Sequence, residues 1–128
     1  PVRKDGESEK AIAGAKTVID TEFVFPFLAH APMEPLNAVL QFKDGKATLK
    51  SGCQMPTIDQ SVIAAILGIK PEDVAIETLW AGGSFGRRAV YNADYVAEAA
   101  HIVKALGTAD PVKFVWTRDD DIKGGYYR

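Results

Sequence analysis

Residues 80–88, Trp-Ala-Gly-Gly-Ser-Phe-Gly-Arg-Arg, form the stretch best suited to chemistry. Three glycines within five positions allow the backbone to bend freely and to approach a ligand closely, because no Cβ atom blocks it. Backbone N–H groups exposed in such a loop, next to the start of a helix, make a site for an anion or a polarised oxygen atom. Arg87 and Arg88 add positive charge where the chain leaves the loop.

The loop does not match the two best-known phosphate-binding motifs. Read from Gly82, the dinucleotide-binding pattern requires glycine at positions 84 and 87, where Ser84 and Arg87 stand. A P-loop read from Gly82 requires glycine at 87 and lysine at 88, and both positions are arginine. One interpretation left open is a small anion- or phosphate-binding, regulatory module that uses residues 82–88. Another is an interaction domain in which the loop is only a strand-to-helix turn with a buried Phe85.

A second segment, residues 27–36, carries His30 and Glu34 between apolar residues and two prolines. The two side chains allow an acid/base or metal pair. Alternatively, each satisfies buried backbone groups while the apolar residues of the segment fill the core. A metal site needs three or four ligands, and His101 is the single other histidine of the sequence. The second interpretation is therefore favoured.

Composition narrows the class of protein. With 128 residues, 47% hydrophobic and 25% charged, the sequence suits one globular domain, 1–128, with a modest core. A net charge of −2 gives no electrostatic reason to expect nucleic acid as a partner. Because Cys53 is the single cysteine, a disulfide within the chain and a cysteine metal cluster are excluded. The sequence begins at Pro1 and ends in Gly-Gly-Tyr-Tyr-Arg, so we expect a fragment of a longer polypeptide.

The first half of the chain predicts one helix and three strands. A short helix is expected over residues 9–15. Alternating β-branched and aromatic residues predict a strand over 17–25 that ends at Pro26. The dipeptide Asp44-Gly45 predicts a hairpin between strands 37–43 and 46–51.

The second half predicts two longer helices, over residues 57–67 and 92–106, each followed by glycine. Strands are expected over 74–80 and over 112–116, the latter buried on both faces. Residues 117–122 contain three consecutive aspartates, which favour a solvated turn or helix start over a metal site. The resulting order predicts an α/β (α+β) fold, a mixed β-sheet with two main helices packed on one face.

Three segments now occur in one order: Phe-Leu-Ala-His-Ala-Pro-Met-Glu-Pro (27–35), Ser-Gly-Cys-Gln-Met-Pro (51–56) and Gly-Gly-Ser-Phe-Gly-Arg-Arg (82–88). Together they resemble the molybdopterin-binding (large) subunit of the xanthine dehydrogenase/aldehyde oxidase family. The likeness is greatest to bacterial members similar to the isoquinoline oxidoreductase beta subunit. It runs from about Asp5 to Arg128 and is specific because all the motifs are in register.

The resemblance implies a domain of a molybdopterin-dependent oxidoreductase that inserts a water-derived hydroxyl into an N-heterocycle or an aldehyde. Molybdenum in this family is held by the pterin dithiolene, so no protein metal ligand is expected. The amide of Gln54 would reach the apical oxo group, and the backbone N–H groups of Phe85 and Gly86 would face the cofactor. The cofactor-binding residues implied are Gln54, Gly82, Gly83, Phe85, Gly86 and Arg87.

Two departures limit what the resemblance implies. The purine-oxidising branch has a substrate-contacting glutamate four positions after the loop phenylalanine, where this sequence has Ala89. A xanthine-like substrate is therefore disfavoured. The general-base glutamate lies in a downstream Gly-Glu-x-Gly motif that this sequence lacks, so no catalytic residue is assigned here. We expect the isolated fragment to be inactive, to bind no cofactor tightly and to self-associate through apolar surface.

The expected partners are the remaining domains of the large subunit, an iron–sulfur subunit that accepts the electrons, and a small-molecule substrate. Bacterial members often carry the cytosine dinucleotide form of molybdopterin. The sequence does not distinguish the bacterial cytoplasm from the periplasm.

Overall fold

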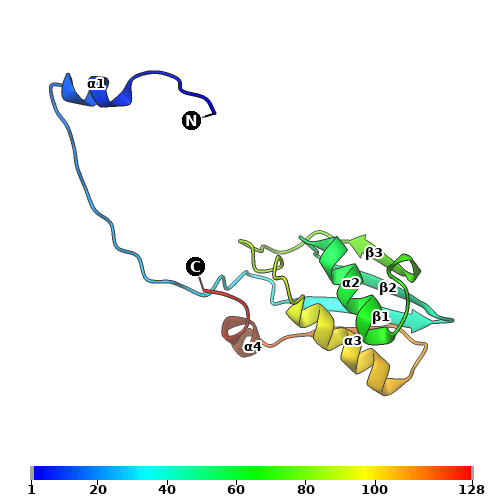
Figure 1. Cartoon of the computed structure of the whole chain (residues 1–128). Helices are drawn as coiled ribbons and strands as arrows, with labels where there is room; N and C mark the ends of the chain where they lie inside the picture. Colours follow the sequence, from blue (N-terminus) through cyan, green and yellow to red (C-terminus); the bar gives the residue numbers. More distant parts are fainter. Residues whose placement is uncertain (1, 128) are drawn as a thin grey trace.

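The computed structural model describes residues 2–127, whose core is a four-stranded mixed sheet (Figure 1). Its strands are β1 (Asn37–Lys43), β2 (Lys46–Ser51), β3 (Val74–Thr78) and β4 (Val112–Val115), in the order β3-β2-β1-β4. Strand β1 is antiparallel to both β2 and β4, whereas β2 and β3 are parallel. The predicted mixed sheet is confirmed.

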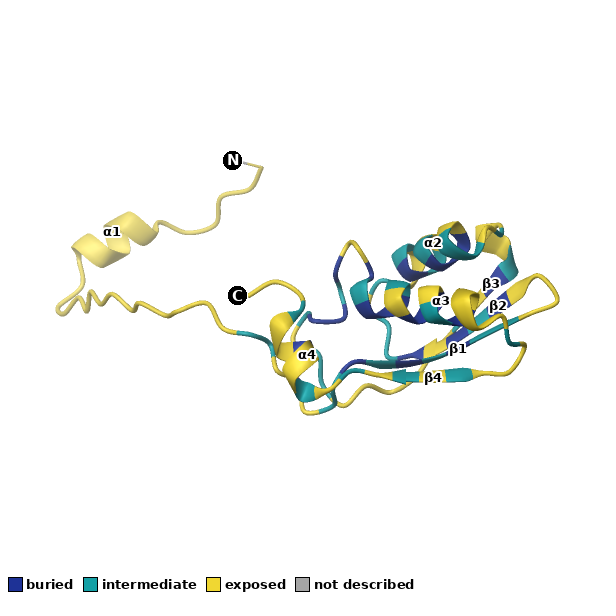
Figure 2. Cartoon of the chain, turned by 90° about the horizontal axis from the view of Figure 1, so that it is seen from below, coloured by how far each residue is buried: buried dark blue, intermediate teal, exposed yellow. Residues whose placement is uncertain are grey.

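Two helices, α2 (Pro56–Leu67) and α3 (Asp94–Leu106), lie side by side on one face of the sheet (Figures 1 and 2). Each ends at a glycine in the left-handed conformation, Gly68 at φ 76° and Gly107 at φ 61°, as predicted. Among residues 2–127, no helix combines the length and the apolar character needed to cross a membrane.

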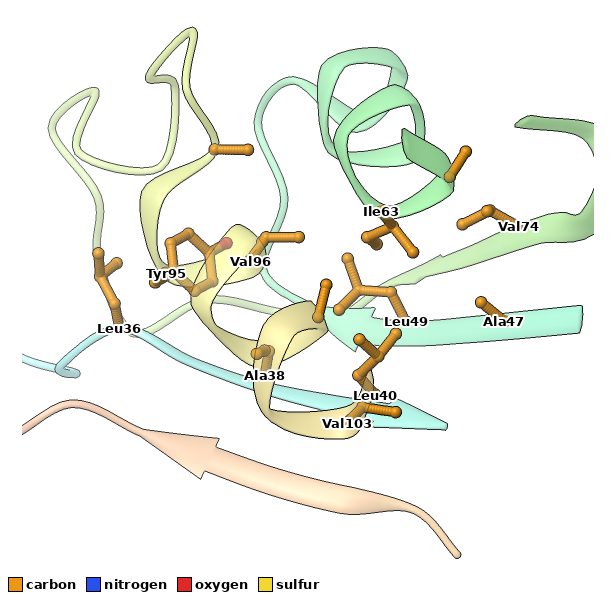
Figure 3. Close-up of a cluster of buried hydrophobic side chains, with 14 residues drawn as sticks. Leu36, Ala38, Leu40, Ala47, Leu49, Ile63, Val74, Tyr95, Val96 and Val103 are labelled. Carbon is orange, nitrogen blue, oxygen red and sulfur yellow. The ribbon is translucent and has the colours of Figure 1, made fainter. Parts of the chain in front are cut away.

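The core lies between this face of the sheet and the two helices (Figure 3). Alternate residues of β1 and β2 point inward, because side chains of a strand alternate between its two faces. They meet the apolar stripes of α2 and α3. The fully enclosed side chains include Leu36, Leu40, Leu49, Ile63, Tyr95, Val96 and Val103.

The hairpin and the short helices complete the described elements. Asp44 and Gly45 both have positive φ, 52° and 74°, and place Lys43 opposite Lys46 in the ladder, so the two-residue turn is confirmed. A 3₁₀ helix, η1 (Pro71–Asp73), precedes β3, and a short helix, α4 (Arg118–Lys123), follows β4.

The strand predicted over residues 17–25 is wrong. Helix α1 (Ser8–Ala13) and residues 14–28, which form no helix or strand, project away from the sheet and are exposed throughout (Figures 1 and 2). The alternating pattern suits a strand, but a strand also needs a partner for its backbone groups, and this segment has none among residues 2–127.

Strand β4 differs from its prediction as well. It lies at an edge of the sheet, pairing with β1 only, and its exposure alternates because α2 and α3 cover just one of the two faces of the sheet. Phe114 packs against the core, whereas Lys113 and Val115 are exposed.

Candidate functional site

The topology brings the three motif-bearing segments to one end of the sheet. Strands β2 and β3 are parallel, so their carboxyl ends lie at the same end of the sheet. The segments there, residues 51–56 and 79–88, therefore leave the sheet side by side. Strand β1 is antiparallel to β2, so the segment that precedes it, residues 27–36, arrives there too. Segments far apart in the sequence therefore form one candidate site.

Glu34 joins the first segment to the glycine loop. Its backbone N–H donates to the carbonyl of Gly82 over 3.0 Å, and the Gly82 N–H donates to its Oε2 over 2.5 Å. A Cβ atom on Gly82 would lie 2.6 Å from the Cβ of Glu34, so this close approach requires glycine. Hydrogen bonds from the Asn37 amide and from Gly82 lower the pKa of Glu34. Its carboxylate thus accepts from a backbone donor, as the favoured interpretation expected of Glu34, and from an amide, but Gly82 is exposed where a buried group was expected.

The apolar residues around His30 do not fill the core as expected. Phe27, Leu28 and Met33 expose 81%, 64% and 89% of their surface. Among residues 2–127, no group of three or more His, Cys, Asp and Glu side chains is placed to hold a metal ion.

Ser84 joins the glycine loop to the segment that follows β2. Its hydroxyl donates to Oε1 of Gln54 over 2.5 Å and accepts the backbone N–H of Arg88 over 3.1 Å. Because the hydroxyl proton is directed at the carbonyl end of the Gln54 amide, the amide NH₂ is the end left to donate elsewhere. Gln54 is exposed, so this donor end is accessible.

The tip of the loop is held in the left-handed region. Phe85 has φ 57° and Gly86 has φ 94°, and Phe85 exposes 75% of its surface. The turn with a buried Phe85 is therefore wrong. Within residues 2–127, no hydrogen bond is donated by the backbone N–H groups of Phe85 and Gly86. Two backbone donors at the tip are thus available to a ligand.

The two arginines do not present the positive charge that the sequence suggested. The Arg87 side chain is 1% exposed, and its guanidinium lies 2.9 Å from Asp94, 3.4 Å from Asp121 and 5.2 Å from the centre of the Trp116 ring. Carboxylates and an aromatic face therefore neutralise it inside the domain.

Arg88 points the other way and is equally buried, with a side chain 1% exposed. Its Nε donates to the carbonyl of Gly83 over 3.2 Å, and its Nη2 lies 3.4 Å from Oε2 of Glu34. The two arginines fix the exit of the loop from opposite sides and leave its tip exposed.

A polar cluster of Ser51, Cys53, Asp59 and Tyr95 includes the residue that precedes Gln54 in the chain. The Tyr95 hydroxyl is 3.2 Å from that of Ser51, and Cys53 and Asp59 affect each other's ionisation. Burial raises the pKa of Asp59 to about 6 and, together with Asp59, raises the pKa of the Cys53 thiol to about 12. Burial likewise raises the pKa of Tyr95 to about 12. The thiol and phenol are neutral at pH 7, and Asp59 is the member of the cluster that titrates near neutrality.

Asp59 predicts a pH-dependent stability. The pKa of Asp59 is about 4 in the unfolded chain and about 6 in the folded one, so folding takes up a proton between pH 4 and pH 6. The free energy of unfolding therefore falls as pH rises from about 4 to about 6. Asp59→Asn should remove that loss and be more stable than wild type at pH 7, by on the order of 2 kcal/mol. Urea unfolding between pH 4 and 7 measures this, with exposed Asp44→Asn as the control. Parallel pH curves for wild type and Asp59→Asn would contradict it.

Three important residues were not identified from the sequence: Ser84, Asp121 and Asp59. Ser84 stands 30 positions from Gln54, and no local pattern predicts a hydrogen bond at that separation. The run of three aspartates predicts a solvated turn or helix start, yet the Asp121 side chain is fully buried. Its position after Trp116 and Thr117, at the start of a helix, was the single available signal.

Comparison with known proteins identifies one family. Residues 2–128 match the family described as molybdopterin cofactor-binding domain. Over 99 residues the chain is 44% identical to the isoquinoline 1-oxidoreductase subunit beta of Brevundimonas diminuta, which covers 77% of this chain and 12% of that subunit. Over 124 residues it is 35% identical to a membrane-bound aldehyde dehydrogenase [pyrroloquinoline-quinone] of Gluconacetobacter polyoxogenes, covering 97% of this chain and 16% of that protein.

A solved structure shares the fold. The chain superimposes on quinoline 2-oxidoreductase from Pseudomonas putida 86 with a TM-score of 0.64 and 23% identity, covering 90% of this chain and 14% of that one. The sequence thus spans less than a fifth of the length of each of these proteins.

Proposed function

Because this chain belongs to the molybdopterin cofactor-binding domain family, we propose that it forms one wall of the cofactor site in a longer molybdenum-dependent oxidoreductase. The long relatives support the view that other domains supply the rest of the site. The proposed parent is the large subunit of a molybdenum hydroxylase.

The observation that carries the proposal is the set of hydrogen-bond donors left over at the loop tip. The backbone N–H groups of Phe85 and Gly86 are unused within residues 2–127, and Ser84 directs the NH₂ end of the Gln54 amide outward. Donors without any net charge suit the polarised oxygen ligands of a bound metal group. The residues present therefore fit the cofactor that the family binds.

The bound cofactor would supply the redox chemistry by which a water-derived hydroxyl is inserted into the substrate. Gln54, Phe85 and Gly86 would orient it by hydrogen bonding. Gly82 and Gly83 would let the loop backbone approach it closely, and Arg87 would hold the loop exit. The general base would come from a part of the parent outside this sequence, so no residue here is assigned a catalytic role.

The substrate class and partners follow the same proposal. Ala89 stands where the purine-oxidising branch has its substrate-contacting glutamate, which favours an N-heterocycle or an aldehyde over a xanthine-like substrate. The partners would be the remaining domains of the large subunit and an iron–sulfur subunit that takes the electrons. The cytosine dinucleotide form of molybdopterin is the proposed cofactor.

The intact mass and metal content of the natively expressed protein test this proposal. We expect a polypeptide several times longer than this chain that carries molybdenum in a stoichiometric amount. A native product without molybdenum, purified with its other metals intact, would contradict the proposal.

The alternative function, an anion- or phosphate-binding regulatory module built on residues 82–88, has less support. Phosphate sites usually combine backbone donors with an accessible positive charge. Here both guanidinium groups next to the loop are buried and occupied by carboxylates. Titration with inorganic phosphate would detect such a module, and saturable binding that Gln54→Ala leaves unchanged would favour it.

Self-association of the isolated 128-residue chain is a further expected result. Residues 17–28 carry exposed large side chains, among them Phe23, Phe25 and Phe27 at 74%, 80% and 81% exposure. Residues 23–28 are apolar without interruption, and an exposed apolar segment of this kind favours association in water. Sedimentation should show oligomers that dissociate when these three phenylalanines are replaced by serine. The control is Ile12→Ser, on the exposed helix α1. A monomer at every concentration would contradict the expectation.

A further inference from the structure

We propose that α4 is a clasp that fastens the 27–36 segment to the glycine loop, with Asp121 as the residue that joins the two. In this account Asp121 is a positioning residue for the loop, and the inference rests on the proposed function of that loop. Its physical basis is a single buried carboxylate shared by two arginines that come from different parts of the site.

The first half of the clasp holds the loop exit. Oδ1 of Asp121 lies 3.4 Å from Nε of Arg87, and both side chains are at most 1% exposed. The chain after α4 then closes over Arg87, because a Cβ atom on Gly124 would lie 2.6 Å from its Nη2 and one on Gly125 would lie 2.9 Å from its Cζ. Arg87 also stacks on Trp116. The C-terminal segment thus encloses the arginine that follows the loop tip.

The second half holds the 27–36 segment. Nη1 of Arg118 lies 2.9 Å from Oδ2 of Asp121. The Nη2 of the same guanidinium donates to the carbonyls of Pro32, over 2.5 Å, and Met33, over 3.0 Å. One carboxylate therefore connects Arg87 to the backbone of the 27–36 segment through Arg118.

The nature of these contacts explains why Asp121 is needed. Within residues 2–127, no nitrogen of the Arg87 guanidinium makes an aligned hydrogen bond, so charge pairing and stacking hold it in place. A buried cation held in this way depends strongly on its counter-charges, because water is excluded. Asp94 supplies one of them from the start of α3, and Asp121 supplies the other together with the connection to Arg118.

The test is Asp121→Asn in the full-length protein that carries this sequence, read by hydrogen–deuterium exchange. Exchange of peptides covering residues 30–36 and 80–88 should rise about tenfold, whereas the β1–β2 hairpin, 37–51, should be unchanged. Asp119→Asn is the matched control, since Asp119 lies in the same helix and is exposed. Loop exchange equal to that of Asp119→Asn would overturn the proposal, as would an equal rise in the hairpin.

A second variant covers the case in which Asp121→Asn fails to fold. Arg118→Met removes the contacts to Pro32 and Met33 and the ion pair with Asp121, but leaves Asp121 paired with Arg87. Exchange should therefore rise in 30–36 and much less in 80–88. No rise in 30–36 would overturn the proposal. In cofactor-loaded protein, Asp121→Asn should also alter the visible circular dichroism of the bound cofactor, and Asp119→Asn should not. Hydrogen–deuterium exchange tests the clasp in protein without cofactor. The metal content of the wild-type protein tests the proposed function, so failure of one can be told apart from failure of the other.

Discussion

Arg87→Met is expected to lower the free energy of unfolding by about 3 kcal/mol, the lower part of the range for breaking a buried ion pair. Methionine keeps the apolar stem but removes the charge, which leaves the buried carboxylate of Asp121 and the half-buried one of Asp94 with less compensation. The loss stays at the low end because Asp121 keeps its contact with Arg118. Urea unfolding followed by Trp116 fluorescence measures the change.

Arg3→Met is the matched control. The ion pair of Arg3 with Asp5 is short, 2.6 Å, but both side chains are largely exposed, so its removal should change stability by less than about 1 kcal/mol. Equal losses for the two variants would contradict the assignment of Arg87 as a buried anchor.

Gln54→Ala is expected to lower kcat/KM of the proposed full-length oxidoreductase about 10- to 100-fold, as removal of a residue that orients a metal group does. The side chain is exposed, so the free energy of unfolding should hardly change. Gln41→Ala is the control, because Gln41 binds a carbonyl at Ala109 away from the loop.

Gln54→Glu separates donation from simple contact. Glutamate has the same size and can still accept the Ser84 hydroxyl proton, but its carboxylate has no N–H to donate. It should therefore reduce kcat/KM at least as much as Gln54→Ala. Wild-type activity in Gln54→Glu would contradict a donor role for this amide.

The parts of the fold that could be predicted from the sequence depend on local patterns. The hairpin follows from Asp44-Gly45, whose positive φ angles suit these residues. The helices α2 and α3 follow from apolar stripes ended by Gly68 and Gly107. Because these elements are short-range in origin, the mixed sheet and its helical layer could be inferred correctly.

The failures concern partners that lie far away in the sequence. Residues 17–25 have a strand pattern, but pairing requires a second strand that residues 2–127 do not supply. The burial of Arg87 depends on Asp121, 34 positions later, and nothing in a run of three aspartates distinguishes the one that turns inward. Exposure of Phe85 likewise follows from its left-handed backbone, which the sequence does not encode for a non-glycine residue.

In the candidate site, too, local motifs could be predicted from the sequence and contacts between distant residues could not. The three segments were identified from their motifs, and the structure places them at one end of the sheet. The contacts between them, Glu34 with Gly82 and Ser84 with Gln54, depend on the tertiary fold and could not be read from spacing.

The most direct test of the central claim is amide exchange of the full-length protein with and without bound molybdopterin. The account predicts strong protection in the peptide that covers residues 82–88, because the N–H groups of Phe85 and Gly86 gain acceptors when the cofactor binds. The hairpin at 37–51 should exchange equally in both states. Equal exchange of residues 82–88 in the two states, with protection confined to other parts of the protein, would contradict the claim that this loop faces the cofactor.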